Sequence, residues 1–359
     1  MIHIISMKKV LITTNHPAPY INKEIEILEK DYEVDVIYRW RKDEYKTWNG
    51  FVGREGLYYD QLSLFGFWRE YRKHDIAILG GWANWYCLLT IIFSFLFRTK
   101  CGVFSDHPHP SIKKNFQFYI RKYILFKSLD YIFCATESTH KFYNNNYGIP
   151  MSKLLFFPYT YDDTYTKENE KINAERIEAL KNPNVKINIF IANNFIDRKG
   201  YNAVVSTFVK LHEDGLLSQY RIKIAGNGEL FESVKKQLDA LNEDIEFLGW
   251  IEADQYTYLM NHCDIYIHAS RFEPFGIPPL DALCREKLLI ASDGVESVSA
   301  MITNTLDGFI FKADSGEELY DILKRVDRSG IYWMGRNGRK KVLEVYSEKT
   351  FSNAINAIR

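Results

Sequence analysis

Short runs of apolar residues alternate with amphipathic segments in the N-terminal half of the chain. The apolar runs have strand length and lie at residues 8–14, 31–38, 75–81, 100–106, 130–136 and 153–158. Apolar residues at helical spacing lie between some of these runs, at residues 20–28, 82–97 and 112–128. Continuous apolar runs are typical of buried parallel strands, which helical crossovers connect. This half therefore predicts a doubly wound α/β domain.

The same alternation resumes after residues 162–186, a stretch rich in charge and asparagine that we interpret as a connection with a short helix near 174–180. Strands are predicted at residues 187–192, 220–225, 245–249, 264–268, 288–292 and 308–311. Helices are predicted at residues 201–212, from 279 onward, and through the tail at 335–359. We expect two domains, residues 1–165 and 166–340, with a C-terminal helix at about 340–359 that packs back on the first domain.

Composition narrows the function without naming it. The chain has 359 residues, and its Lys plus Arg and its Asp plus Glu both total 46, so the formal net charge is zero. A general nucleic-acid binder usually has a basic excess, so no nucleic-acid partner is expected. The five cysteines are scattered without metal-site spacing, which predicts buried free thiols rather than a zinc site or a disulfide framework.

Two apolar segments raise the question of membrane contact. Residues 82–97 are shorter than the roughly 20 residues of a spanning helix, so they predict either a core helix or a helix that lies on a membrane. Residues 112–128 combine aromatic residues with five cations, Lys113, Lys114, Arg121, Lys122 and Lys127. This segment predicts either an ordinary amphipathic helix or a peripheral membrane contact. No signal peptide is evident, and we expect a cytoplasmic location, at the inner face of the cell membrane if the contact exists.

The strongest chemical signal is a loop that enters a helix at residues 271–282. Glu273 and Asp281 flank seven residues that include Gly276, where the backbone can approach a ligand closely. The helix start offers N–H groups and a positive dipole end for an anion. Glu273 then accepts bonds from sugar hydroxyls and Asp281 from a ribose diol. In the alternative interpretation Asp281 only balances the helix dipole and Glu273 is solvated.

This segment resembles the E-x7-E signature of the retaining glycosyltransferases of the GT-B fold, a group that is family 4-like (glycosyl transferases group 1). The second acid is Asp281 here, one methylene shorter than the glutamate of the family. Other pieces match in the same order, namely residues 224–230, 247–251, 264–270 and 198–200. The resemblance runs from Lys8 to about Ser352, specific in the second half and generic in the first. It implies two Rossmann-like doubly wound domains that face each other across a cleft.

The resemblance also implies roles for individual residues. The catalytic candidates are Glu273, His107 and Lys199. The donor-binding candidates are Arg198, Lys199, Asn194, Gly226, Gly228, Trp250, Glu273, Phe275, Gly276, Ile277 and Asp281. The family has an arginine where this chain has Asn194, and whether Arg198 takes over its role stays open. His107 stands where the family often has a histidine near the reacting sugar, although a loop histidine also fits a solvated or packing role.

The implied activity is transfer of a sugar, with retention, from a nucleotide-diphosphate sugar to a saccharide or lipid-linked saccharide, in bacterial cell-surface polysaccharide synthesis. The C-terminal domain would bind the donor and the N-terminal domain the acceptor. No cofactor is expected besides the nucleotide-sugar co-substrate, and no metal, because the chain lacks a convincing D-x-D motif. Two alternatives stay open: a nucleotide-sugar 2-epimerase of the same fold, and a non-catalytic sugar-nucleotide-binding partner. The base, the sugar and the acceptor are not specified by the sequence.

Overall fold

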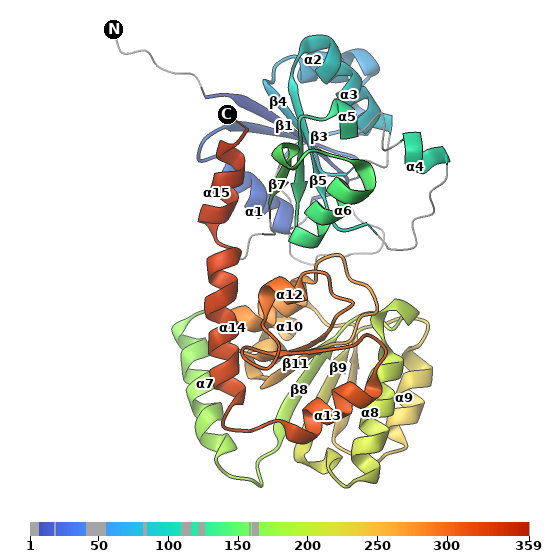
Figure 1. The fold of residues 1–359 in the computed structure, drawn as a ribbon, viewed down its shortest axis with the longest axis vertical. Coiled ribbons are helices and arrows are strands. Elements are labelled where there is room, and N and C mark those ends of the chain that lie inside the picture. Colours follow the sequence, from blue (N-terminus) through green and yellow to red (C-terminus); the bar gives the residue numbers. More distant parts are fainter. Residues whose placement is uncertain are drawn as a thin grey trace. The chain divides into compact units, whose positions relative to one another are not determined.

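The computed structural model describes residues 7–17, 19–40, 55–81, 85–108, 116–120, 126–157, 159 and 165–358. The chain divides into two compact units (Figure 1), which are described separately. Unit 1 comprises Met1–Thr160 and Tyr346–Arg359, and unit 2 comprises Tyr161–Val345. The sequence placed the two boundaries at 165/166 and at about 340. Each unit is a Rossmann-like α/β fold built on one parallel sheet.

Unit 1 holds a seven-stranded sheet in the order β3-β2-β1-β4-β5-β6-β7. Its strands are β1 (Lys9–Thr14), β2 (Glu33–Tyr38), β3 (Leu57–Tyr58), β4 (Ile76–Leu79), β5 (Lys100–Ser105), β6 (Tyr131–Cys134) and β7 (Leu154–Phe156). Every neighbouring pair is parallel. The direction of strand order reverses between β1 and β4, and ligands bind at such a switch point in open α/β sheets.

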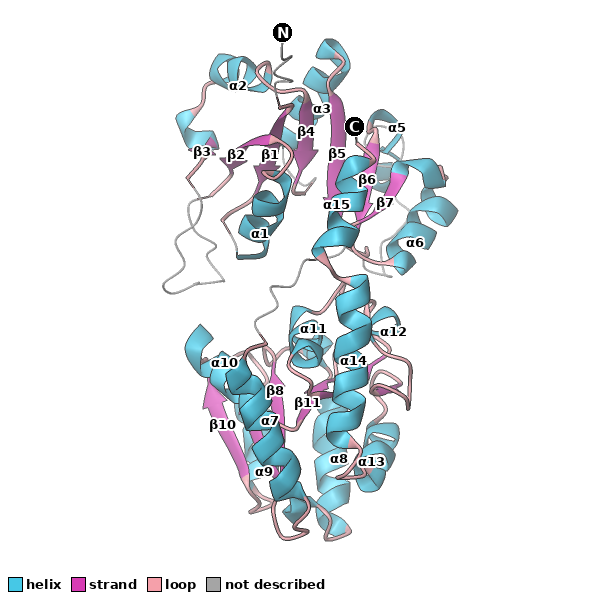
Figure 2. Cartoon of the chain, turned by 90° about the vertical axis from the view of Figure 1, so that its left-hand side faces the viewer, coloured by secondary structure: helices cyan, strands magenta, loops and turns pink. Residues whose placement is uncertain are grey.

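Helices cover both faces of this sheet (Figure 2). They are α1 (Pro19–Leu28), α2 (Leu64–Tyr71), α3 (Trp85–Phe97), α4 (Phe116–Ile120), α5 (Phe126–Ser128), α6 (Glu137–Tyr147) and α15 (Glu348–Asn356), with short 3-10 turns at Tyr59–Gln61 and Met151–Lys153. One core joins the sheet to α2, α3 and α6. The other joins it to α1 and α15, where the ring centroids of Phe157 and Phe351 lie 3.8 Å apart.

Unit 2 holds a six-stranded sheet in the order β10-β9-β8-β11-β12-β13. Its strands are β8 (Ile187–Ala192), β9 (Tyr220–Ala225), β10 (Ile245–Gly249), β11 (Ile265–His268), β12 (Leu288–Ser292) and β13 (Phe309–Phe311). All pairs are parallel. Each strand falls where the sequence predicted one, and the order reverses between β8 and β11.

The helices of unit 2 are α7 (Lys167–Leu180), α8 (Tyr201–Glu213), α9 (Phe231–Asp239), α10 (Ala253–His262), α11 (Ile277–Cys284), α12 (Val298–Met301), α13 (Gly316–Arg325) and α14 (Ile331–Val345), with 3-10 turns at Asp197–Lys199 and Leu217–Gln219. Two predictions of length were wrong. The connection holds a 14-residue helix, α7, rather than a short one near 174–180. The tail is two helices, α14 in unit 2 and α15 in unit 1, rather than one.

Three further expectations meet the structure here. All five cysteines are buried and free, as predicted. Between residues 109 and 129 the structure describes only α4, α5 and Leu129. Four of the five cations, Lys113, Lys114, Arg121 and Lys122, therefore lie outside the described residues. Across the described part of the chain, no helix is both long enough and apolar enough to cross a membrane.

Candidate functional site

Four loops meet at the carboxyl ends of β8, β9, β11 and β12 in unit 2. Backbone hydrogen bonds tie them together: the N–H of Arg271 donates to Arg198 (2.8 Å), that of Glu273 to Gly294 (2.9 Å) and that of Phe195 to Asn227 (2.9 Å). Ligands bind at this edge in open α/β sheets, around the switch point between β8 and β11. Most of the sequence-predicted donor residues lie on these loops.

Gly226 and Gly228 let two of these loops pack backbone against backbone. Gly226 has φ +134° and Gly228 has φ +153°, both unusual for an L-residue with a side chain. A Cβ at Gly226 would lie 1.9 Å from the carbonyl oxygen of Asn193, and one at Gly228 would lie 2.5 Å from that of Phe195. Both glycines are therefore required by the loop packing, whatever ligand the loops take.

Lys199 and Glu273 form the centre of the candidate site. The Lys199 ammonium contacts the Glu273 carboxylate directly. Arg198 approaches the same carboxylate, with Nη1 3.4 Å from Oε2. Lys199 is only 8% exposed, whereas the side chain of Arg198 is nearly half exposed. The structure thus brings together three predicted residues from two loops, with two cations around one acid.

A buried histidine lies next to this carboxylate. It was not predicted as a site residue from the sequence. His268 ends β11, and its Nε2 lies 3.9 Å from Oε2 of Glu273 and 3.2 Å from the Ser270 hydroxyl. Its Nδ1 lies 3.3 Å from the Asn193 side-chain amide nitrogen. Burial lowers the pKa of His268 and outweighs the opposite effect of the Glu273 carboxylate, so the neutral imidazole is favoured. The available signal in the sequence was that His268 is a polar residue at the end of the otherwise apolar strand β11.

These neighbours keep Glu273 ionised. Burial alone would raise its pKa, but His268 and the ammonium of Lys199 more than compensate and lower the pKa to about 2. At neutral pH the carboxylate is therefore a permanent hydrogen-bond acceptor. Such a group suits hydroxyl recognition and does not suit general-acid work, for which the pKa would have to lie near the working pH.

Helix α11 differs from its prediction at its start. Gly276 is the N-cap with φ +96°, and the helix begins at Ile277. Pro278 and Pro279 then occupy the second and third helical positions, and proline has no N–H. The expected set of N–H donors is therefore reduced to the first residues of the turn, so an anion here would depend more on the two cations.

The remaining predicted donor residues are placed as follows. Asp281 is buried and its carboxylate accepts from the Arg285 guanidinium one turn along α11. Phe275 is buried, whereas Ile277 and Trp250 are 44% and 49% exposed. Asn194 is exposed, and its carbonyl accepts from the Ile196 N–H at 3.0 Å. Trp250 lies directly after β10, which is an edge strand of the sheet, and not on the loops around Glu273.

Unit 1 has a cavity of its own at the carboxyl ends of its strands. The volume is about 160 Å³, and the lining includes Glu24 from α1, Asp106 after β5 and Tyr159. Tyr159 donates its hydroxyl to both carboxylate oxygens of Asp106, at 2.9 and 3.0 Å. His107, the predicted catalytic residue, is not among the lining residues, and its ring packs edge-on against Phe142 at 5.3 Å.

Glu24 is the most perturbed acid of this cavity. Burial, and secondly the charge of Asp106, raise its pKa to about 8. The residue is only 8% exposed, so at neutral pH it is a protonated acid that can donate a hydrogen bond. Glu24 was not predicted from the sequence. The available signal was its position on the apolar face of α1, which it shares with Ile21, Ile25 and Leu28.

No group of three or more His, Cys, Asp or Glu side chains placed to hold a metal ion occurs within the residues that the structure describes. The adjacent acidic pair at residues 162–163, which is not a D-x-D motif, lies outside them. The side chains described at the candidate site are two cations, a carboxylate and a neutral histidine. This donor set matches an anion with hydroxyl groups better than it matches a cation.

Comparison with known proteins agrees with the fold. Residues 172–330 match the family model described as "Glycosyl transferases group 1". An uncharacterized glycosyltransferase of Methanocaldococcus jannaschii is 25% identical over 279 residues, which are 73% of this chain and 69% of the relative. A 41.2 kDa protein of the cps region of Klebsiella pneumoniae is 25% identical over 303 residues, 80% of this chain and 78% of that protein.

Solved structures share the architecture over nearly the whole chain. The Anabaena protein Alr3699/HepE, crystallised with UDP-glucose, superposes with a TM-score of 0.74. The match covers 98% of this chain and 99% of that one at 15% sequence identity. At such identity the likeness establishes the fold alone. The GT-B architecture implied by the sequence motifs is therefore confirmed.

Proposed function

We propose that this chain, whose residues 172–330 match the family model of the glycosyl transferases group 1, transfers a sugar, with retention at the anomeric carbon, from a nucleoside-diphosphate sugar to a saccharide or lipid-linked saccharide. The context is synthesis of a cell-surface polysaccharide, which the relative from the cps region supports. The donor is a UDP-sugar, which the UDP-glucose complex of the HepE protein supports.

The observation that carries this proposal is the pair of cations around Glu273. Lys199 is nearly buried, so water screens its charge poorly, and the half-exposed Arg198 lies beside it. A diphosphate is the leaving group, and negative charge grows on its oxygen as the glycosidic bond breaks. Preorganised cations stabilise that charge in the transition state. Glu273, held ionised, would accept hydrogen bonds from hydroxyls of the transferred sugar.

The proposed step balances without any further reactant. The bond from the anomeric carbon to the diphosphate oxygen breaks, and the acceptor oxygen forms a bond to the same face of that carbon. The acceptor hydroxyl proton passes to the departing diphosphate oxygen, so the products are the glycoside and a nucleoside diphosphate. This route needs no carboxylate nucleophile and no cofactor. We propose that Lys199 and Arg198 take the charge-stabilising part that a divalent metal would otherwise take.

The cavity of unit 1 is our candidate for acceptor contacts. Protonated Glu24 offers a hydrogen-bond donor, and Asp106 offers an acceptor in the same cavity. Phe104, Phe133 and Phe157 supply aromatic surface to the lining. Alternating donors and acceptors beside aromatic rings suit the hydroxyls and the C–H faces of a sugar. We further propose that His107, which follows Asp106 but lies outside the cavity lining, contributes near the reacting sugar.

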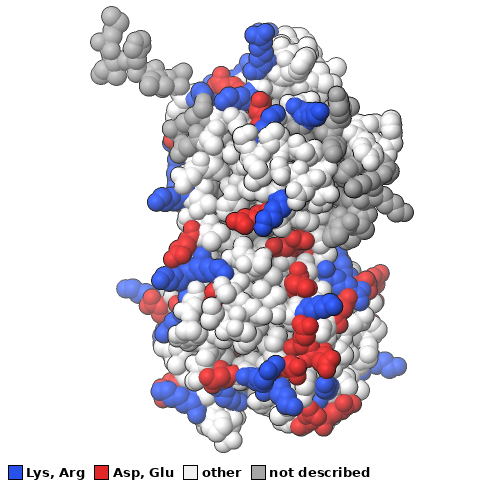
Figure 3. Space-filling model, viewed as in Figure 1, with Lys and Arg blue, Asp and Glu red and all other residues white. Residues whose placement is uncertain are grey.

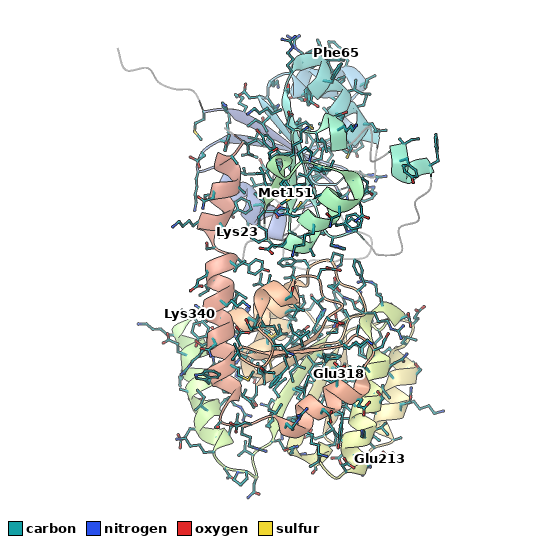
Figure 4. All side chains as sticks on the ribbon, in the orientation of Figure 1. Lys23, Phe65, Met151, Glu213, Glu318 and Lys340 are labelled. Atoms are coloured by element: carbon teal, nitrogen blue, oxygen red, sulfur yellow. The ribbon has the colours of Figure 1, made fainter. Side chains whose placement is uncertain are left out.

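Thermal-shift measurements with UDP, GDP and ADP test the donor, since a ligand that binds the native state stabilises it by mass action. We expect UDP to give the largest shift, and Lys199→Met to remove it. Transfer from the corresponding nucleotide sugar should fall at least a hundredfold in Glu273→Gln. The matched control is Glu213→Gln, on an exposed turn at the end of α8 (Figure 4), which should change neither.

Four measurements test this proposal against its alternatives. Incubation with the donor alone would interconvert two nucleotide sugars if the protein were a 2-epimerase, and a transferase would leave the sugar intact or hydrolyse it slowly. Proton NMR of the product reports whether the anomeric configuration is retained. Activity that persists in excess chelator supports metal independence. Binding without turnover, in every donor and acceptor combination tried, would leave only the non-catalytic role.

A further inference from the structure

Helix α3 of unit 1 is apolar on its outward face as well as on the face that packs in the core, and its two hydroxyl residues face inward. Thr90 is 0% exposed and Ser94 is 6% exposed, so both face the core. Phe95 is 83%, Leu96 is 62% and Ile92 is 51% exposed. A helix on a globular protein normally packs its apolar stripe inward and shows its polar face to water.

The buried hydroxyls need no water, because the helix itself satisfies them. Thr90 donates to the carbonyl of Tyr86 at 2.8 Å, and Ser94 donates to the carbonyl of Thr90 at 2.9 Å. This pattern of back-bonding makes polar residues compatible with an apolar interior. The outward apolar residues, by contrast, have no such compensation. The arrangement is therefore stable inside the fold and unfavourable only where α3 meets water.

Large exposed apolar residues lie on α3 and also at the start of the neighbouring α2. Leu88, Ile92, Phe95 and Leu96 follow one another at helical spacing along one side of α3, and α2 packs against α3. Leu64 and Phe65 of α2 are 58% and 67% exposed, and Figure 4 shows Phe65 at the surface. We call the following six residues the apolar face: Leu64, Phe65, Leu88, Ile92, Phe95 and Leu96. Contiguous exposed patches of this kind mark interaction sites.

Cations border the apolar face. The Arg72 guanidinium lies 5.2 Å from the ring centroid of Trp68 and 5.7 Å from that of Phe97, so it joins the two helices at their C-terminal ends. Arg69 and Arg98 are exposed nearby. Glu70, the one acid of α2, pairs with Lys73 at 2.5 Å, and α3 has no charged residue. In Figure 3 the surface over these helices is largely uncharged, with Lys and Arg at its border.

We propose that the apolar face docks on a lipid bilayer that contains anionic lipid. The chemistry is that of an interfacial helix: large apolar side chains enter the acyl boundary and arginines at the border meet anionic headgroups. With 13 residues, α3 is about 20 Å long, and its other face is packed in the core, so it lies along the membrane. A second copy of the chain fits less well, because a twofold interface would set these cations against themselves.

Vesicle flotation tests this without any nucleotide sugar, so its outcome is independent of the proposed activity. The probes are vesicles of phosphatidylcholine alone and of phosphatidylcholine with phosphatidylglycerol in a two-to-one ratio. We expect the full chain to float with the anionic vesicles and to stay largely unbound with the neutral ones. Replacing a buried Phe side chain by Asp removes about tenfold or more in partitioning, so Phe95→Asp should lose most of the binding, and Phe95→Trp should retain it.

Two further variants separate the contributions. Arg72→Gln should weaken binding to anionic vesicles about fivefold, and raised salt should do the same. Trp333→Asp, on an exposed ring of α14 in unit 2, is the matched control and should float like the parent chain. Failure of the parent to float with anionic vesicles, or equal flotation of Phe95→Asp, overturns the proposal. So does a concentration-dependent dimer in sedimentation that Phe95→Asp abolishes, because that result would assign the face to a second copy.

Discussion

Glu24 should make the protein less stable as the pH rises, and Glu24→Gln should remove that effect. The residue is buried on α1 beneath the cavity of unit 1, where burial and Asp106 raise its pKa from 4.5 to about 8. Between these two values the folded chain keeps a proton that the unfolded chain releases. Stability must therefore fall across this window as the pH rises. Glutamine has nearly the same shape and does not titrate.

The two pKa values give the magnitude. The raised pKa of Glu24 lowers the free energy of unfolding by about 1 kcal/mol at pH 5 and by about 4 kcal/mol at pH 8, relative to a side chain that does not titrate. Any change in packing or hydrogen bonding caused by the amide is the same at both pH values. The quantity to compare is thus the difference between the two proteins at pH 8 minus their difference at pH 5. It should be about 3 kcal/mol in favour of Glu24→Gln.

Urea unfolding followed by tryptophan fluorescence measures these differences, with both proteins compared at each pH. The matched control is Glu26→Gln, on an exposed position of the same helix, which should behave like the parent at both pH values. Equal effects of Glu24→Gln at pH 5 and pH 8 would refute the reasoning. That result would mean that Glu24 is already ionised when folded and that the cavity holds two negative charges.

Three other changes probe unit 2. Lys199→Met should raise the pKa of Glu273 from about 2 toward its ordinary value, because it removes the contacting cation, and a carbon-13 NMR titration of the carboxylate would show the change. Gly226→Ala should lower the stability of unit 2 by several kcal/mol, on the order of a core defect, because its Cβ would lie 1.9 Å from a carbonyl oxygen; urea unfolding measures the loss. Arg285→Met should cost about 3–5 kcal/mol by leaving Asp281 buried without its cation, whereas Arg285→Lys should recover part of it in the same assay.

The sheets could be predicted from the sequence because parallel strands are buried on both faces. Runs such as residues 187–192 and 288–292 are apolar at all but one position, which is typical of buried strands of that length. Only the second half of helix α7 was predicted, because its sequence is mostly polar and its apolar stripe is weak. Its start was nevertheless marked, since Thr166 and Asn169 form a capping box at the N-terminus.

The site was predictable in part and for a similar reason. Motif order brought Lys199 and Glu273 to the correct edge of one sheet, because the loops after parallel strands converge there. Motifs did not reveal Glu24, whose meaning depends on how deeply α1 buries it. They also did not reveal the apolar face of α3. A helix that is apolar on both sides has no periodicity from which the inward side can be read.

The charged side chains at the two edges of the unit 2 sheet are paired to different extents, and this difference indicates which edge binds a ligand. At the amino edge, buried Asp264 is fully paired: it accepts from Arg176 at 2.6 and 3.1 Å and from the Tyr332 hydroxyl at 2.8 Å. At the carboxyl edge, Glu273 contacts Lys199 directly, and Arg198 lies beside this pair with its side chain nearly half exposed. A fully paired cluster needs nothing more to be stable, whereas a half-exposed cation beside a nearly buried ion pair is accessible to an incoming anion. A diphosphate supplies negative charge to which Arg198 can bind, which is why the carboxyl edge, and not the fully paired amino edge, is where we place the donor.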